Sequence, residues 1–192
     1  MRSLSFAFFL CAAQPVMAAD FYSLTVSRDG DTYGMSADAH LAAPPAAVYA
    51  VLTDYEHLTR ISNAVLKSHV VQRLDTGDVL VYTDSRVCAL FFCRHITELQ
   101  RYTRPGPQDL VAEVVPEQSN LKMGRTLWHM QAENDGTRLH WEMTAVPGFW
   151  VPPFIGSVLV EHGLRTEGRR GIAGVEKLAR ERAHLPPLES EH

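Results

Sequence analysis

The chain has 192 residues, of which 46% are hydrophobic, and its 18 Lys and Arg against 22 Asp and Glu give a formal net charge of −4. This acidic balance argues against a nucleic-acid partner, because the phosphate backbone selects for clustered basic residues. No stretch after residue 18 approaches the roughly 18 consecutive apolar residues that a membrane-spanning helix needs. The length favours one domain with a substantial core, and we find no internal repeat or linker.

The first 18 residues have the pattern of a secretory signal peptide. Arg2 gives a positive start, residues 4–13 form an apolar run too short to span a bilayer, and Val16-Met17-Ala18 places compact side chains where a signal peptidase reads them. We therefore expect a signal peptide over residues 1–18, cleavage after Ala18 or Ala19, and a periplasmic or secreted product. The alternatives are a buried N-terminal element and a lipid anchor at Cys11, which the bulky residue before that cysteine disfavours.

Two strands and two short helices are expected next. Residues 22–26 and 32–41 read as strands around the turn cluster 28–31, which suits a hairpin. Pro44 and Pro45 stop the second strand, because proline cannot donate to a strand ladder but is tolerated in the first turn of a helix. The first helix is expected over residues 46–52, and Thr53-Asp54 resembles the cap of a second short helix that reaches Ile61.

Six further short strands joined by turn residues predict a meandering antiparallel sheet. They are expected over residues 65–74, 79–87, 93–102, 110–115, 125–133 and 137–146. A two-residue turn at Asp135-Gly136 would give the last two strands one apolar and one polar face. The pairs would be Trp128 with Met143, Met130 with Trp141 and Ala132 with Leu139 on the apolar face, and His129 with Glu142 and Gln131 with His140 on the polar face.

A long final helix is expected from about Phe154 to Ala183, with apolar residues repeating at steps of three and four. Four glycines lie within it, at positions 163, 168, 171 and 174, although glycine inside a helix costs about 1 kcal/mol relative to alanine. Two explanations stay open: a frayed or kinked helix, or a close approach to bulky sheet side chains such as Trp128 and Trp141. Residues 184–192 are expected to form a disordered tail.

Two cysteines remain after the expected cleavage, Cys88 and Cys93. In one continuous strand their Cα atoms would lie about 16 Å apart, whereas a disulfide needs at most about 7 Å. A bridge therefore requires the chain to double back, with residues 89–92 at the tip of a hairpin. An oxidising compartment favours the bridge, and the alternative is two independently buried thiols.

The order strand, two helices, six-stranded meander and long helix is that of the helix-grip fold. This is an α+β architecture in which a curved antiparallel sheet, here of about six to eight strands, wraps around a C-terminal helix. Residues 41–55, Leu-Ala-Ala-Pro-Pro-Ala-Ala-Val-Tyr-Ala-Val-Leu-Thr-Asp-Tyr, resemble the opening of the START-like (SRPBCC) superfamily of polyketide cyclase and coenzyme Q-binding type. The resemblance implies a START-like ligand-binding domain over residues 19–183. The extra first strand and the cysteine loop depart from the family pattern.

The resemblance also implies binding of a lipid, isoprenoid quinone, sterol or polyketide in a cavity between sheet and helix, with a minority of members acting as cyclases. We find no catalytic, metal-binding or cofactor motif, and the family offers no invariant catalytic residue to carry over. Large side chains that face a helix containing glycines suit an apolar pocket. The candidate ligand-binding residues are Trp128, Met130, Trp141, Met143, Phe149, Trp150, Phe154 and Glu161. Glu161 either pairs with Arg165 one turn along the helix or anchors a polar ligand head.

The leading hypothesis is an exported, non-enzymatic carrier for a hydrophobic small molecule. One alternative is a cyclase-like or hydrolase-like enzyme, which would need a buried Asp, Glu or His with a shifted pKa. The other is a partner-binding subunit whose cavity has collapsed. Phe149, Trp150 and Phe154, together with Phe91 and Phe92, are expected either to form the apolar rim of the cavity or to seal the core. For Phe91 and Phe92 a transient membrane or partner contact is a further alternative.

Overall fold

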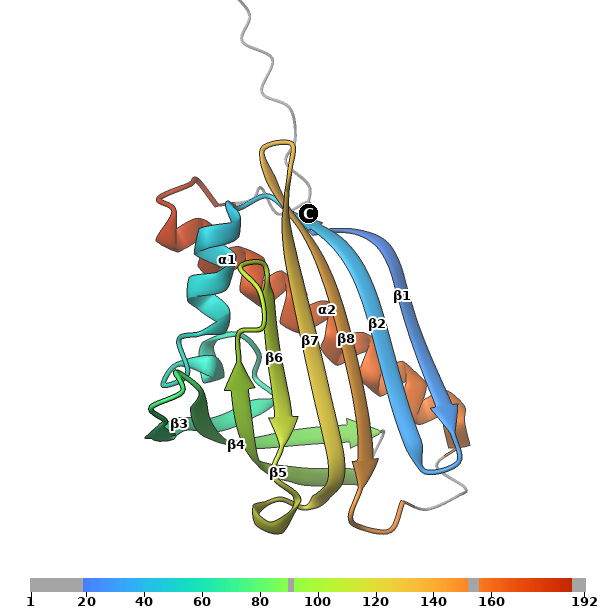
Figure 1. The fold of residues 1–192 in the computed structure, drawn as a ribbon. Helices are drawn as coiled ribbons and strands as arrows, with labels where there is room; N and C mark the ends of the chain where they lie inside the picture. Colours follow the sequence, from blue (N-terminus) through green and yellow to red (C-terminus); the bar gives the residue numbers. More distant parts are fainter. Residues whose placement is uncertain (1–18, 90–91, 152–155, 188–192) are drawn as a thin grey trace, which may run out of the picture.

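The protein folds into one curved antiparallel sheet that wraps around a long C-terminal helix (Figure 1). The computed structural model describes residues 19–89, 92–151 and 156–187. The strands are β1 (Asp20–Asp29), β2 (Thr32–Leu41), β3 (Val65–Arg73), β4 (Val79–Ala89), β5 (Phe92–Thr103), β6 (Asp109–Val114), β7 (Leu121–Glu133) and β8 (Gly136–Pro147). Their order across the sheet is β1-β2-β8-β7-β6-β5-β4-β3. This arrangement confirms the expected helix-grip fold.

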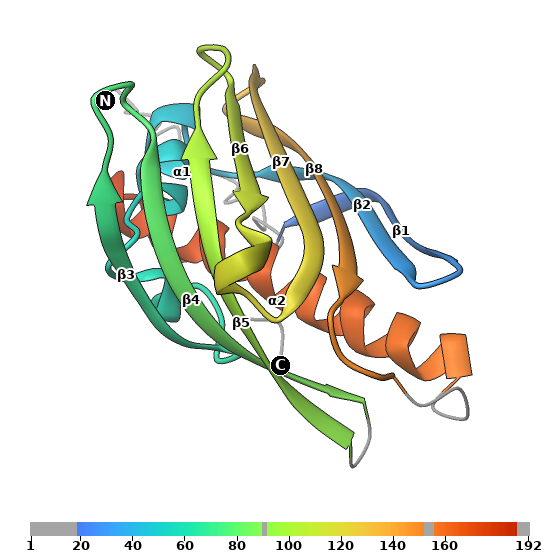
Figure 2. The ribbon, with the colours of Figure 1, turned by 60° about the horizontal axis from the view of Figure 1, so that its bottom comes forward.

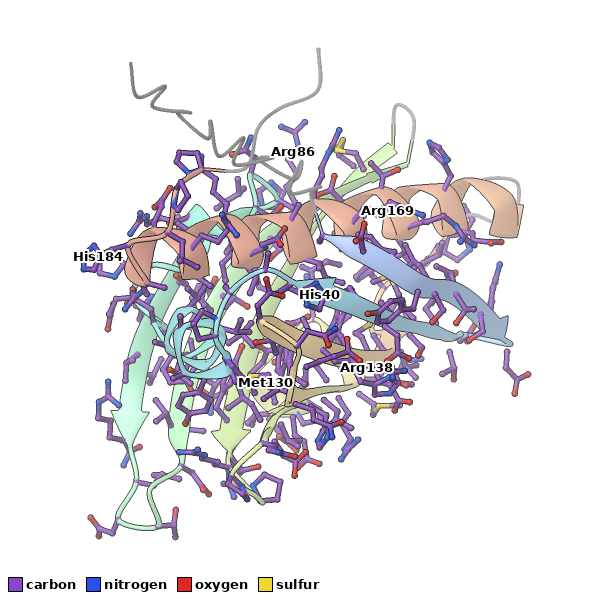
Figure 3. The ribbon with its side chains drawn as sticks, turned by 90° about the horizontal axis from the view of Figure 1, so that it is seen from above. His40, Arg86, Met130, Arg138, Arg169 and His184 are labelled. Carbon is purple, nitrogen blue, oxygen red and sulfur yellow. A yellow bond between two sulfur atoms is a disulfide. The ribbon has the colours of Figure 1, made fainter. Side chains whose placement is uncertain are left out.

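Two helices lie on the concave side of the sheet. They are α1 (Pro45–Leu52) and α2 (Gly156–Arg182), and α2 crosses the sheet over most of its width (Figures 1 and 3). The second half of α2 packs against α1 and the sheet through Ile172, Val175 and Ala179, which are at most 4% exposed. These side chains form the core between the helices and the sheet. Ile172 and Val175 also line one side of the candidate site, which lies between α2 and the sheet.

The β7–β8 hairpin corrects the expected register. Glu133 pairs with Gly136, so the turn residues are Asn134 and Asp135, and Trp128 pairs with Trp141 instead of Met143. Asn134 adopts a positive φ of 51°, a conformation that asparagine tolerates better than most residues. Moving the turn by one residue shifts every partner by two positions, so each side chain stays on its expected face.

The other expected pairs change in the same way. Met130 pairs with Leu139, Ala132 with Thr137, His129 with His140 and Gln131 with Arg138.

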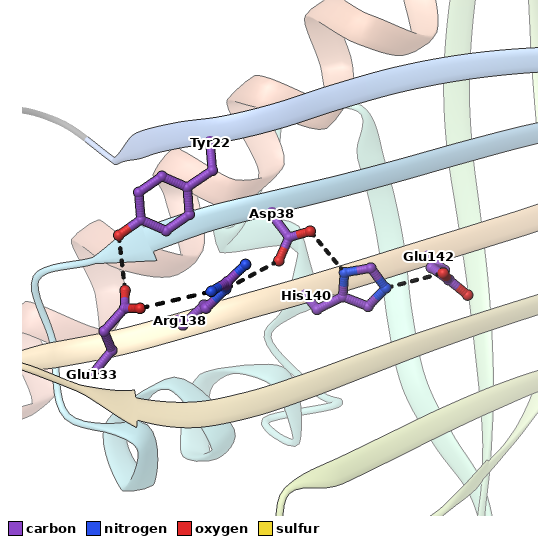
Figure 4. A network of polar contacts seen from close by, with 6 residues as sticks. All are labelled: Tyr22, Asp38, Glu133, Arg138, His140 and Glu142. Atoms are coloured by element: carbon purple, nitrogen blue, oxygen red, sulfur yellow. Dashed lines mark hydrogen bonds and ion pairs between the residues drawn. The ribbon is translucent and has the colours of Figure 1, made fainter.

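The convex face of β1, β2, β7 and β8 carries a network of polar contacts (Figure 4). Its members are Tyr22, Asp38, Glu133, Arg138, His140 and Glu142. The ring nitrogens of His140 lie 3.1 Å from the Asp38 carboxylate and 3.0 Å from the Glu142 carboxylate. Burial lowers the pKa of His140, but the hydrogen bonds and charges of Glu142 and Asp38 outweigh it and raise the pKa above its ordinary value. This face is polar, as expected from the sequence.

Three local elements differ from expectation. The second short helix is a single 3-10 turn, η1 (Leu58–Arg60), and a further 3-10 turn, η2 (Pro116–Gln118), precedes β7. Strand β7 begins at Leu121, four residues earlier than expected.

In the expected tail, the backbone N–H of Leu185 donates to the Arg180 carbonyl oxygen at 3.0 Å, and the Arg180 guanidinium donates to the Pro186 carbonyl oxygen.

Cys88 and Cys93 form a disulfide bond across the β4–β5 hairpin. They are directly paired residues, with their Cα atoms 4.0 Å apart. The chain therefore doubles back between them, and the expected bridge is confirmed. The hairpin extends beyond the rest of the sheet (Figure 2). Residues 90 and 91 of its expected tip lie outside the described part of the chain.

The expected signal peptide, residues 1–18, also lies outside the described part. Among the residues that are described, no helix is both long enough and apolar enough to cross a membrane.

Candidate functional site

Two adjoining cavities lie between the concave face of the sheet and α2, with volumes of about 270 and 320 Å³. They share a set of lining residues from β4, β5, β7, β8 and α2, and therefore lie side by side. The shared residues are Ser85, Val87, Glu98, Gln100, Thr126, Met143 and Leu164. A space of this size between sheet and helix is large enough for a small organic molecule.

Strands β7 and β8 supply the apolar wall of this space. Trp128, Trp141 and Met143 all line the cavity from the concave face, as the alternation of these strands requires. Met130 lies on the same face but is only 2% exposed and belongs to the packed core beside the cavity. Trp128 stacks at 6.1 Å on the ring of Tyr102, which extends the aromatic wall onto β5.

The glycines of α2 determine how closely the helix approaches this wall. A Cβ atom on Gly168 would lie 2.9 Å from the Met35 sulfur and 3.2 Å from the Trp141 ring, so here the absence of a side chain permits close packing. At Gly174 a Cβ would overlap the carbonyl oxygen of Ile61. Gly171 differs, because a Cβ there meets nothing within 4 Å. It lines the larger of the two cavities and leaves space unfilled.

One stripe of polar side chains crosses the apolar cavity. Glu98, Gln100 and Tyr102 occupy alternate positions on β5 and so point to the same face. The Gln100 amide donates to the Glu98 carboxyl group at 2.5 Å, and the Tyr102 hydroxyl donates to the Gln100 amide oxygen at 3.1 Å. The three side chains form a connected chain of hydrogen bonds inside the cavity.

Glu98 has a strongly perturbed acidity. Burial raises its pKa from 4.5 to about 7, although the hydrogen bond from Gln100 acts in the opposite direction. Burial, with nearby Tyr55 and Glu98, also raises the pKa of Tyr102, which keeps that hydroxyl protonated. Glu98 is thus a carboxyl group that can hold or release a proton near neutral pH, within a mainly apolar space.

Sequence reasoning missed Glu98. In this part of β5, Glu98 and Gln100 point to the concave face and Leu99 points to the convex face, the reverse of the usual pattern. Leu99 is 4% exposed, and its backbone groups are bonded by Val115 and Ser119 next to η2. Ile96 and Tyr102, which alternate with the same parity as Glu98, were the available signals that this face is the inner one.

Residues that link β8 to α2 lie at one end of the cavity. Phe149 and Val151 line it together with Cys88 and Arg94 of the β4–β5 hairpin. The Arg94 guanidinium lies 5.9 Å from the centre of the Phe149 ring. Trp150 points outward and is 64% exposed. Phe154 and Phe91 lie outside the described residues, as does the side chain of Phe92.

Glu161 forms an ion pair one helical turn along α2. The Arg165 guanidinium donates to the Glu161 carboxylate at 2.8 Å and to the Leu24 carbonyl oxygen at 2.6 Å. Glu161 is not among the described residues that line the cavity. These contacts correspond to the ion-pair interpretation of Glu161. In the described part of the chain, no group of three or more His, Cys, Asp or Glu side chains is placed to hold a metal ion.

A curved sheet that holds a helix over an apolar cavity defines the class of START-like ligand-binding domains. Residues 34–180 match the family model described as polyketide cyclase / dehydrase and lipid transport. Because this match spans most of the chain, the protein belongs to that family. A search of curated protein sequences finds no significant match.

Solved structures with the same fold include both enzymes and lipid-transfer proteins by name. The Zhui aromatase/cyclase from Streptomyces sp. R1128 has a TM-score of 0.64 at 15% identity, covering 79% of this chain and 96% of that one. The STAR-related lipid transfer protein from Xanthomonas axonopodis has a TM-score of 0.54 at 17% identity, covering 84% and 99%. Human STARD10 has a TM-score of 0.59 at 15% identity, covering 91% and 77%. At these identities the likeness establishes the fold alone.

Proposed function

We propose that this protein is an exported carrier that binds a hydrophobic small molecule with one polar end. The observation that carries the proposal is the unfilled, mainly apolar space beneath α2, crossed by the hydrogen-bonded polar stripe of Glu98, Gln100 and Tyr102. A lipid, isoprenoid quinone, sterol or polyketide-like molecule has the matching chemistry. The leader-like residues 1–18 and the Cys88–Cys93 disulfide support a periplasmic or secreted location.

The proposed ligand lies with its apolar body against Trp128, Trp141 and Met143 and its polar end at Glu98. Below pH 7 the Glu98 carboxyl group is mainly protonated, so it can donate a hydrogen bond to a carbonyl or hydroxyl oxygen. A neutral carboxyl group is also compatible with an apolar ligand, because it leaves no buried charge in the cavity. The ligand is therefore expected to carry an oxygen acceptor and no negative charge at the end that reaches Glu98.

The ligand's path is proposed to pass between the β4–β5 hairpin and the β8–α2 connection. Phe149 and Val151 line this end of the cavity, and Trp150 lies exposed beside them. Phe154, Phe91 and Phe92 complete the apolar rim in this proposal. A variant that keeps only Trp150, with the other two tryptophans changed to Phe, tests it by fluorescence during titration with a quinone. An unchanged Trp150 spectrum, under conditions where binding is shown independently, would contradict this path.

Gly171 offers a direct test of the cavity. Gly171→Leu places a side chain in the open space without a backbone clash, whereas Ala173→Leu adds similar bulk on the exposed side of the same helix. Mass spectrometry of organic extracts from the purified exported protein should detect a co-purifying ligand in the wild type and in Ala173→Leu, but not in Gly171→Leu. Equal recovery of ligand from all three folded proteins would rule out this cavity as the binding site.

A cyclase-like enzyme is the second candidate, and Glu98 is the observation that favours it. A carboxyl group with a pKa of about 7 in an apolar cavity suits proton transfer to or from a bound substrate. The two functions differ in what happens to the extracted molecule. If it is incubated with fresh protein, a carrier returns it with unchanged mass and structure, whereas an enzyme converts it, and Glu98→Gln abolishes the conversion while leaving binding in place.

A further inference from the structure

A buried carboxylate lies on α2 and does not line either cavity. Glu176 is 1% exposed to solvent. One of its oxygens accepts a hydrogen bond from the backbone N–H of Ala19 at 2.8 Å, and the other accepts from the backbone N–H of Ala42 at 2.7 Å. Glu176 thus joins three segments: the start of β1, the turn after β2, and α2.

Glu176 lacks a close positive charge. Among the described residues, no basic side chain comes within the 4.0 Å ion-pair distance of its carboxylate. Arg180, one turn further along α2, donates to the carbonyl oxygens of Ala42 and Pro186 instead. A carboxylate buried with only neutral donors is unfavourable, because amide N–H groups replace its lost hydration only in part. A cation at the position of one donor would remove that deficit.

We propose that the peptide bond between Ala18 and Ala19 is cleaved, and that the new α-ammonium group of Ala19 forms a buried ion pair with Glu176. Hydrolysis by an endopeptidase of the export pathway adds one water molecule to this bond. Ala18 leaves with a carboxylate, and Ala19 keeps an α-amino group that takes up a proton at neutral pH. The single amide N–H at 2.8 Å from the carboxylate thereby becomes a charged group with three donors.

The surroundings of Ala19 select this bond over the next one. Ala19 is 9% exposed and its methyl group packs in the hydrophobic core, whereas Asp20 is exposed. Cleavage after Ala19 would remove the donor and place the new terminus on Asp20, whose own side chain is negative. Retention of residues 1–18 would keep a neutral amide beside Glu176. The structure therefore distinguishes between the two cleavage positions that the sequence leaves open.

The ion pair would attach β1 to α2. Strand β1 lies at the edge of the described sheet and has a neighbouring strand on one side only. Among the described strands, β1 pairs with β2 alone, and it precedes residue 34, where the match to the family model begins. Arg165 of α2 already holds the middle of β1 through the Leu24 carbonyl oxygen. The Ala19–Glu176 pair would hold its first residue to the same helix, so processing and the docking of β1 would be coupled.

The first test determines the N-terminus of the exported protein. The full 192-residue chain is produced in a bacterium with a periplasm, and the periplasmic product is analysed by intact mass and N-terminal sequencing. We expect a chain that begins at Ala19. A product that begins at Asp20 or any other residue, or that retains residues 1–18, would overturn the proposal.

The second test asks whether the α-ammonium group interacts with Glu176. A glycine inserted between Ala18 and Ala19 in the full chain leaves that glycine as the new terminus, and Ala19 then carries a neutral amide as it does in the structure. This insertion should lower the thermal midpoint of the exported protein by about 5–10 °C. In a Glu176→Gln background the same insertion should change the midpoint by less than about 2 °C. The control Glu181→Gln, an exposed position on the same helix, should leave the effect of the insertion intact.

An insertion that lowers the midpoint equally in all three backgrounds would contradict the ion pair. If Glu176→Gln does not fold, the wild type still decides the question through the reactivity of its terminus. At pH 7 an amine-acylating reagent should modify the α-amino group of the native protein at least tenfold more slowly than that of the urea-unfolded chain. Equal rates in the two states would overturn the proposal.

Discussion

Glu98→Gln should make the protein more stable at alkaline pH and leave its stability nearly unchanged in acid. The substitution keeps the shape of the side chain and its ability to accept the hydrogen bond from Gln100, but it removes the charge. Burial raises the pKa of Glu98 from 4.5 to about 7 on folding. The unfolded chain therefore releases this proton more readily than the folded protein does.

The size of the effect follows from this difference in pKa. Below pH 4.5 the Glu98 carboxyl group is protonated in both the folded and the unfolded state, so its ionisation does not change the free energy of unfolding. Between pH 4.5 and 7 ionisation of the unfolded chain alone lowers the free energy of unfolding, and above pH 7 the loss reaches a plateau. Since a tenfold change in an equilibrium constant corresponds to about 1.4 kcal/mol, the plateau lies at roughly 3 kcal/mol.

The assay is urea denaturation of the wild type and Glu98→Gln at intervals from pH 4 to pH 9. The difference in unfolding free energy should grow across pH 4.5–7 and stay constant above it. Glu113→Gln is the control, because Glu113 lies on the exposed surface in an ion pair with Arg125 and should show no such rise. Parallel stability curves for the wild type and Glu98→Gln would refute the assignment of Glu98 as a buried, neutral carboxyl group.

Three further predictions concern packing and the disulfide. Gly174→Ala should destabilise the protein by about 1–3 kcal/mol in urea denaturation, because the added Cβ overlaps the Ile61 carbonyl oxygen. Gly171→Ala, on the same helix with nothing within 4 Å, should instead stabilise it by up to about 1 kcal/mol, and a loss there would contradict the open space. Thiol labelling of the unfolded, unreduced exported protein should find Cys88 and Cys93 both blocked; reducing their bridge should cost about 2 kcal/mol.

Local pattern was sufficient to predict the fold and the apolar wall. Alternation in β7 and β8 places Trp128 and Trp141 on one face whatever the exact register, because a two-residue shift preserves the face. The exact pairing partners of β7 and β8 depended on the positive φ of Asn134. The sequence did not predict this conformation, because Asp135-Gly136 is the more familiar turn sequence. The requirement that the chain double back between Cys88 and Cys93 likewise followed from distance alone.

The roles of Glu98 and Glu176 were decided only by the tertiary structure. On β5, Glu98 and Gln100 face the cavity while Leu99 faces the other side, so the hydrophobic pattern of this strand alone misplaces Glu98. On α2, the sequence alone assigns no role to Glu176 beside the apolar positions Ile172 and Val175. It becomes buried because the backbone of Ala19 and Ala42, 157 and 134 residues away, closes over it. Contacts between such distant segments leave no periodic signal, because each residue type is compatible with many surroundings until the chain is folded.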